Sequence, residues 1–188
     1  MQKILLILIN LMVIGWCRGA AVSPLTVDRE LSNVEIDVRA TVGSFVGHLA
    51  DYEATLKYNR DSEQVSSAEI RFNFADVKTG EEKRDRHMHE WQETETYPTG
   101  KFVLWQLTPG SGGVEMVATG ELTFHGHTQK LEFPVAILTE GRTVVIDGET
   151  IVDTQQFGLP IIRMFLALKV NPLVTIRFHL HSTLKETA

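Results

Sequence analysis

Cysteine is almost absent from this 188-residue chain, and long hydrophobic runs are few. The single cysteine, Cys17, leaves no disulfide bond with which the chain could hold its own fold together. The apolar stretch Ile4–Trp16 has 13 residues, whereas a membrane-spanning helix needs about 20. No later segment is long and apolar enough to span a bilayer. These absences exclude a disulfide-stabilised small domain and a helical membrane protein.

Basic residues are outnumbered as well. The chain has 18 Lys and Arg against 24 Asp and Glu, a formal net charge of −6, and it contains no basic run. Affinity for nucleic acid comes largely from Lys and Arg on phosphates, so nucleic acid is excluded as a partner. The same balance gives no electrostatic attraction to anionic lipid headgroups, and we expect no stable membrane insertion.

The first 21 residues have the three parts of a secretory signal peptide. Lys3 supplies the positive start, Ile4–Trp16 the apolar centre, and Gly19-Ala20-Ala21 the small residues before a cleavage site. Cleavage after Gly19 is an alternative, and we favour cleavage after Ala21. The prediction is a signal peptide at 1–21 and a mature domain at 22–188, with a net charge of −8, that is exported to the periplasm.

Cys17 lies inside this leader, so the mature chain has no cysteine at all. A lipid-anchored alternative would need Ile14-Gly15-Trp16-Cys17 to act as a lipoprotein signal. Trp16 stands where that signal has a small residue, so the match fails at a key position. We therefore expect a soluble mature protein that depends on its hydrophobic core rather than on disulfide bonds.

The motifs of common enzymes are missing too. The chain has no G-x-S-x-G nucleophile motif, no phosphate-binding glycine loop and no dinucleotide fingerprint. Asp85 and His87 lie two residues apart, but no nucleophile is evident beside them. We expect Asp85 to cap or pair within its segment, and we predict that the protein is not an enzyme.

The histidines suggest a metal site only weakly. They include three H-x-H pairs: His87/His89, His125/His127 and His179/His181. Alternate residues of a strand share a face, so a strand-borne pair can chelate one metal ion. Only His125/His127 has this geometry, and no third ligand is evident from spacing. We predict no metal and no cofactor other than a bound isoprenoid lipid or quinone, with a metal-dependent enzyme as the least favoured alternative.

What the mature chain does have is the two-residue alternation of apolar and polar side chains that is typical of strands. The predicted strands are Val34–Arg39, Tyr52–Tyr58, Gln64–Val77, Lys101–Leu107, Val114–Ala118, Gly120–Thr128, Lys130–Leu138, Thr143–Asp153 and Leu168–Leu180. Short strands with turns between them and one apolar face each indicate an antiparallel sandwich or barrel. The predicted fold class is all-β, a lipocalin-like barrel.

Two segments interrupt the strands. Glu81–Gln92 is dense in charge and follows the turn at Thr79-Gly80, which predicts a short helix that acts as a lid on the barrel. Phe157–Leu168 is apolar but contains Gly158, Pro160 and a lone Arg163. This second segment is either a loop packed over one end of the barrel or the rim of an apolar cavity, with Arg163 near an anionic ligand group.

The apolar faces of the predicted strands carry many large side chains that point to the barrel interior. Such a face usually forms a packed core, but an eight-stranded barrel is also wide enough to hold one small ligand. The sequence leaves a filled and a hollow barrel open. The candidate ligand-binding residues are Ile70, Phe72, Phe74, Phe102, Leu104, Phe124, Phe133, Val135, Ile146, Phe157 and Phe178.

Short motifs in a fixed order resemble a known family. They are Thr79-Gly80, Arg84-Asp85-x-His87, Tyr97-Pro98, Gly120-x-Leu122-Thr123-x-His125-Gly126-x-Thr128 and Phe157-Gly158. The match runs from about Ser32 to Phe178 and is similar to the YceI-like family of lipocalin-like barrels that bind polyisoprenoid lipids. The resemblance implies a periplasmic barrel whose apolar tunnel holds an isoprenoid such as a quinone or a polyprenyl phosphate.

Together these observations predict a periplasmic carrier for an apolar isoprenoid lipid. The polar rim of its tunnel is predicted to comprise Arg84, Asp85, His87, His125 and Arg163. The alternative is a structural or stress-related barrel with a packed interior and no physiological ligand. The sequence leaves open which lipid binds, whether donor or acceptor proteins exist, and whether the protein is a monomer or a homodimer.

Overall fold

The computed structural model describes residues 21–41, 43–164 and 168–185, without the side chains of residues 164 and 168. All of the predicted signal peptide 1–21 except Ala21 therefore lies outside the described residues, and its cleavage stays a prediction.

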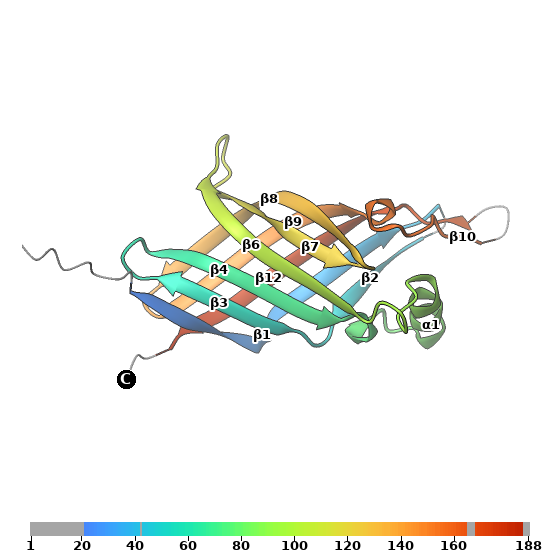
Figure 1. The fold of residues 1–188 in the computed structure, drawn as a ribbon, viewed down its shortest axis with the longest axis horizontal. Helices are drawn as coiled ribbons and strands as arrows, with labels where there is room; N and C mark the ends of the chain where they lie inside the picture. Colours follow the sequence, from blue (N-terminus) through green and yellow to red (C-terminus); the bar gives the residue numbers. More distant parts are fainter. Residues whose placement is uncertain (1–20, 42, 165–167, 186–188) are drawn as a thin grey trace, which may run out of the picture.

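Eight antiparallel strands close into a barrel, which confirms the predicted fold class (Figure 1). Hydrogen-bonded neighbours follow the order β12-β9-β8-β7-β6-β4-β3-β1, and β1 pairs back with β12 to complete the circle. The strands are β1 (Val22–Arg39), β3 (Glu53–Asn59), β4 (Gln64–Asn73), β6 (Thr99–Pro109), β7 (Met116–Phe124), β8 (His127–Glu140), β9 (Thr143–Asp153) and β12 (Leu173–Leu184).

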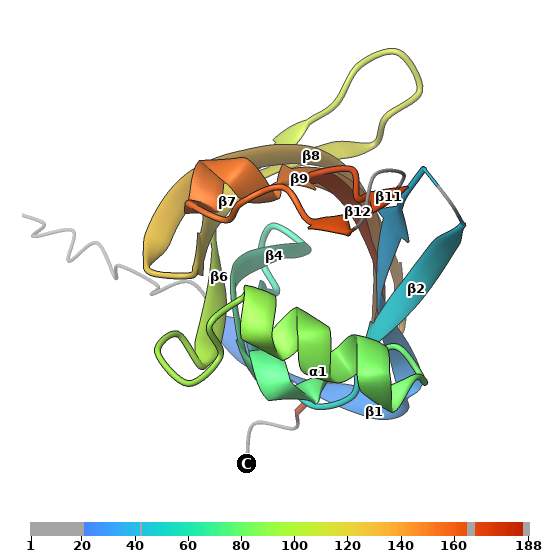
Figure 2. The same cartoon turned by 90° about the vertical axis from the view of Figure 1, so that its right-hand side faces the viewer.

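Smaller elements gather at one end of this barrel. Strands β2 (Ser44–Leu49) and β5 (Val77–Lys78) extend the sheet from β1, and β10 (Arg163–Met164) pairs with β11 (Leu168–Lys169). Two 3₁₀ turns, η1 (Phe74–Asp76) and η2 (Thr154–Phe157), follow β4 and β9. Figure 2 looks onto this end, which we call the mouth, and shows β2, β11 and α1 around it.

Helix α1 (Glu82–Trp91) lies across part of the mouth, as the predicted lid Glu81–Gln92 requires (Figure 2). The residues of α1 alternate between exposed and half-buried, and none is fully buried. Met88 and Trp91 turn inward and pack against buried residues of the barrel. No helix in the described part of the chain has the length and apolar character needed to cross a membrane.

Several strand boundaries differ from the prediction. Val114–Ala118 and Gly120–Thr128 were predicted as two strands, but β7 runs unbroken from Met116 to Phe124 and turns at His125 and Gly126, whose φ angles are 47° and 71°. Strand β4 ends at Asn73, because the backbone turns into η1 before the predicted end at Val77.

The last predicted strand, Leu168–Leu180, is divided at Pro172, which has no N–H to give to a ladder. Conversely, β1 starts 12 residues before the predicted Val34. Its early part was missed because the pairing with β12 jumps from Asp28 to Asn33, and the bulge between them breaks the two-residue alternation. Strand β2 was not predicted, since Gly43 precedes it and Gly47 interrupts it.

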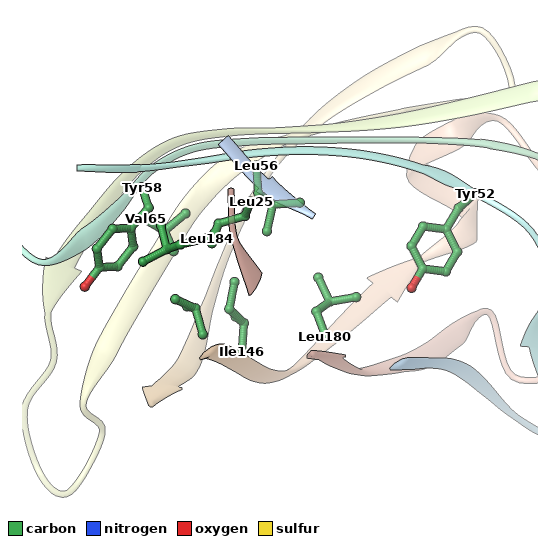
Figure 3. Close-up of a cluster of buried hydrophobic side chains, with 9 residues drawn as sticks. Leu25, Tyr52, Leu56, Tyr58, Val65, Ile146, Leu180 and Leu184 are labelled. Carbon is green, nitrogen blue, oxygen red and sulfur yellow. The ribbon is translucent and has the colours of Figure 1, made fainter. Parts of the chain in front are cut away.

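Buried side chains close the end of the barrel that lies opposite the mouth. Figure 3 shows Leu25, Tyr58, Val65 and Leu184 gathered there, and each is at most 6% exposed. Tyr52 belongs to the same cluster but lies apart from that group, further along the barrel (Figure 3). The barrel is thus solidly packed at one end, and α1 lies at the other.

Candidate functional site

A cavity of about 980 Å³ occupies the interior between the packed end and α1. Its walls come from the inward faces of all eight barrel strands, and most of its lining side chains are aliphatic or aromatic. The volume is at the upper end of the range of about 300–1,000 Å³ that small-molecule sites occupy. The question that the sequence left open, filled or hollow, is therefore answered in favour of a hollow barrel.

Ten of the eleven predicted ligand-binding residues line this cavity. They are Ile70, Phe72, Phe74, Phe102, Leu104, Phe124, Phe133, Val135, Ile146 and Phe178. The exception is Phe157, which is 1% exposed and packs edge-on against Phe124 with 5.6 Å between ring centroids. Phe157 follows β9 in η2, outside the alternating pattern, so its side chain joins the layer behind the lining.

Three of the lining phenylalanines lie over glycines of neighbouring strands. An added Cβ would come within 2.2 Å of the Phe72 ring at Gly100, 2.6 Å of the Phe102 ring at Gly120 and 2.3 Å of the Phe178 ring at Gly148. Each ring therefore occupies the position that the Cβ atom of any residue other than glycine would take on the neighbouring strand. The ring lies against the barrel wall instead of across the cavity. This pairing helps to keep the interior open.

In the described part of the chain, charged side chains reach the cavity at its mouth and nowhere else. Within the described residues, the acidic and basic groups in its lining are Glu81, Lys83, Arg84 and Arg163. His87 lines the cavity beside them. The Arg84 guanidinium lies 4.5 Å from the centroid of the Phe45 ring, which connects α1 to β2. Three of the five predicted rim residues, Arg84, His87 and Arg163, are thus at the mouth.

Asp85 does not line the cavity but fastens the helix instead. Its carboxylate accepts hydrogen bonds from the Thr79 backbone N–H at 2.9 Å and from the Thr79 hydroxyl at 2.5 Å. At the other end of α1, the Trp91 indole N–H donates to the Pro160 carbonyl at 2.8 Å. These bonds tie α1 to the turn between β5 and α1 and to the segment that follows η2, as expected for a lid held in place.

His125 is also absent from the lining, because it helps to build the frame of the mouth. Its Nδ1 lies 2.8 Å from the Phe157 carbonyl oxygen, and its ring is 4.3 Å from that of Tyr97. An added Cβ at Gly126 would meet the Tyr97 ring at 2.9 Å. Three of the sequence motifs therefore meet in one cluster that joins the β7–β8 turn to η2.

The histidine pairs do not form a metal site in the described residues, where no group of three or more His, Cys, Asp or Glu side chains is placed to hold a metal ion. His127 Nδ1 lies 2.9 Å from the His125 carbonyl oxygen, so the Nδ1 atoms of both histidines of this pair lie at hydrogen-bond distance from backbone carbonyl oxygens. His179 instead pairs with Asp147 on the barrel surface, 2.7 Å away.

Sequence reasoning missed Tyr52, which lines the cavity and is 5% exposed. It is the first residue of the predicted strand Tyr52–Tyr58 and shares an inward face with Leu56. That alternation places Tyr52 inside the barrel, but it does not distinguish a residue that lines a cavity from one in a packed core.

The chain matches the model of the YceI-like domain over residues 25–182. It belongs to the YceI-like family. Among solved structures, BcnA from Burkholderia cenocepacia is 24% identical and superposes with a TM-score of 0.73, covering 84% of this chain and 100% of BcnA. No curated protein sequence matches the chain.

Two more distant structures share the YceI-like fold. A polyisoprenoid-binding domain from Saccharophagus degradans is 14% identical, with a TM-score of 0.64. The match covers 89% of this chain and 100% of that domain. The YceI protein of Campylobacter jejuni is also 14% identical, with a TM-score of 0.59 and coverage of 75% of this chain and 85% of its own. At these identities the structures establish the YceI-like fold alone.

Proposed function

We propose that this YceI-like protein is a non-enzymatic periplasmic carrier that holds an apolar isoprenoid lipid, a quinone or a polyprenyl phosphate, inside its barrel. The observation that carries the proposal is the cavity of about 980 Å³, which is lined mostly by apolar side chains and has charged residues at its mouth. A long hydrocarbon chain fits such a site because burial of apolar surface drives binding. The polyisoprenoid-binding domain of similar fold supports the same ligand class.

A comparison of two tryptophan substitutions tests the proposal. Phe72 lines the cavity, whereas Phe157 is packed behind it. In delipidated protein, Phe72→Trp should reduce isoprenoid uptake and cost little stability, because the larger ring can enter empty space. Phe157→Trp should lower the free energy of unfolding by about 1–3 kcal/mol, since overpacking strains a filled core.

The measurements are lipid per chain, by mass spectrometry of organic extracts, and thermal midpoints. Failure of the wild-type protein to take up any isoprenoid would refute the carrier function. Equal uptake by Phe72→Trp together with a clearly lowered midpoint would mean that the interior is solid.

The proposed location has its own test. The leader predicted at 1–21 should be removed during export, so intact-mass measurement of the periplasmic protein should give a chain that begins at Val22. A diacylglycerol-modified Cys17 at the new N-terminus would instead show a lipid-anchored protein.

A further inference from the structure

Among the residues that the structure describes, one buried polar group of the cavity lining has no hydrogen-bond partner. The Tyr52 hydroxyl forms no hydrogen bond with any described residue, although the tyrosine is 5% exposed and lines the cavity. In Figure 3 this hydroxyl points toward the barrel interior on the side of Leu180. Buried hydroxyls nearly always have a hydrogen-bond partner, because a hydroxyl that leaves water without gaining one loses the free energy of its hydrogen bonds to water.

The polar neighbours of Tyr52 are engaged elsewhere. The Ser32 hydroxyl, in the β1 bulge, lies near the phenol but donates to the Asp28 carbonyl at 2.5 Å and accepts the His181 backbone N–H at 2.9 Å. The Arg29 guanidinium lies 4.4 Å from the centroid of the Tyr52 ring and pairs with Asp51. Neither side chain lines the cavity.

The phenol is a donor in this environment. Burial raises the pKa of Tyr52, and the smaller opposing effects of Ser32 and Arg29 do not cancel that rise. The side chain therefore stays protonated at neutral pH and offers an O–H to whatever fills the cavity.

We propose that Tyr52 is a specificity-determining residue that donates a hydrogen bond to an uncharged oxygen atom, which the ligand carries past the mouth into the barrel. The oxygen is uncharged because the basic groups of the lining, Lys83, Arg84 and Arg163, all lie at the mouth. A phosphate at the depth of Tyr52 would lack a counter-charge, and burying an unpaired charge is prohibitive.

This inference rests on the proposed function and narrows it. Of the two ligand classes, it selects a prenylated quinone with its ring inside the barrel over a polyprenyl phosphate with its headgroup at this position. The quinone carbonyl is the acceptor, and the isoprenoid tail fills the remaining apolar volume.

The test uses two probes that differ only in oxygen, a benzoquinone with an isoprenoid tail and a benzene ring with the same tail. The variants are Tyr52→Phe and, as a matched control, Tyr58→Phe. Tyr58 belongs to the same buried cluster as Tyr52, but it lies on β3 and outside the cavity lining. Tyr52→Phe should weaken quinone binding roughly 5- to 30-fold, and leave binding of the oxygen-free probe unchanged. Tyr58→Phe should change neither.

A spectroscopic measurement separates a hydrogen bond from a change of shape. The infrared C=O stretch of the bound quinone should move to higher frequency in Tyr52→Phe but not in Tyr58→Phe. Unchanged quinone affinity and C=O frequency in Tyr52→Phe, or equal losses for both probes, would overturn the inference while leaving the carrier function intact. If the wild-type protein took up neither probe, the carrier function itself would be wrong.

Discussion

Glycine is required beside three lining phenylalanines for reasons of space. Gly100 and Gly148 are directly opposite Phe72 and Phe178 in the strand ladders. None of these glycines has a positive φ angle, so the backbone conformation does not require glycine at these positions. At Gly100 and Gly148 the phenylalanine ring requires it, because the ring occupies the position of the missing Cβ, and at Gly120 the Val103 carbonyl oxygen crowds that position together with the Phe102 ring.

This pairing predicts an uncommon effect of a glycine-to-alanine substitution. In Gly148→Ala the three atoms nearest to the new methyl group all belong to the Phe178 ring, the closest at 2.3 Å, so the ring must swing into the cavity. We expect lipid uptake to fall, whereas the free energy of unfolding should change by less than about 1 kcal/mol, because alanine is also better than glycine inside a strand. Uptake assays and denaturant unfolding measure the two effects.

Gly120→Ala is the matched control. Its methyl group would meet the Val103 backbone carbonyl oxygen at 2.5 Å, which cannot move aside as a ring can. This variant should lose about 1–3 kcal/mol of stability. Full lipid uptake by Gly148→Ala would show that the Phe178 ring does not control the open volume.

At the scale of elements, helix α1 is a small amphipathic lid that depends on a few specific bonds. It has no fully buried residue, so packing alone holds it weakly. The Asp85–Thr79 and Trp91–Pro160 hydrogen bonds fix its two ends. Local opening of α1 is therefore the expected route by which a ligand enters and leaves.

Asp85→Ala should accelerate that opening. The variant loses two hydrogen bonds to Thr79, worth about 1–3 kcal/mol together, and we expect ligand dissociation to become roughly 5- to 100-fold faster. Trp91 lines the cavity, so the recovery of its fluorescence after a quinone leaves reports the rate. Arg86→Ala, an exposed change on the same helix, is the control. Equal rates in both variants would mean that α1 is not the gate.

At the scale of the whole molecule, the sequence predicts the fold class well because alternation is a local signal. Lys130–Leu138 forms the larger part of β8, and Thr143–Asp153 is β9 itself, both in the predicted phase. The helix was placed to within one residue at each end. Strand β2 escaped prediction because a short, glycine-containing strand has no clear period.

The site was harder to predict than the fold. Apolar alternation identified the inward faces, but the same pattern describes a packed core and a cavity lining, so only the packing of side chains distinguishes them. Asp85 and His125 were placed on the rim from motifs, yet they bind to the chain's own backbone through Thr79 and Phe157. The unpartnered hydroxyl of Tyr52 depends on contacts between distant segments, which no local pattern encodes.

On the function proposed above, a bound lipid would fill the cavity and complete the hydrophobic interior that the chain alone leaves open. A ligand that binds only the folded chain adds RT ln(1 + [L]/Kd) to stability, about 2.7 kcal/mol at a concentration of 100 Kd. The empty barrel therefore unfolds more often than the filled one, and unfolded chains are the ones that proteases remove. On the function proposed above, the cellular level of the protein would follow the supply of its lipid, with no separate regulator between them.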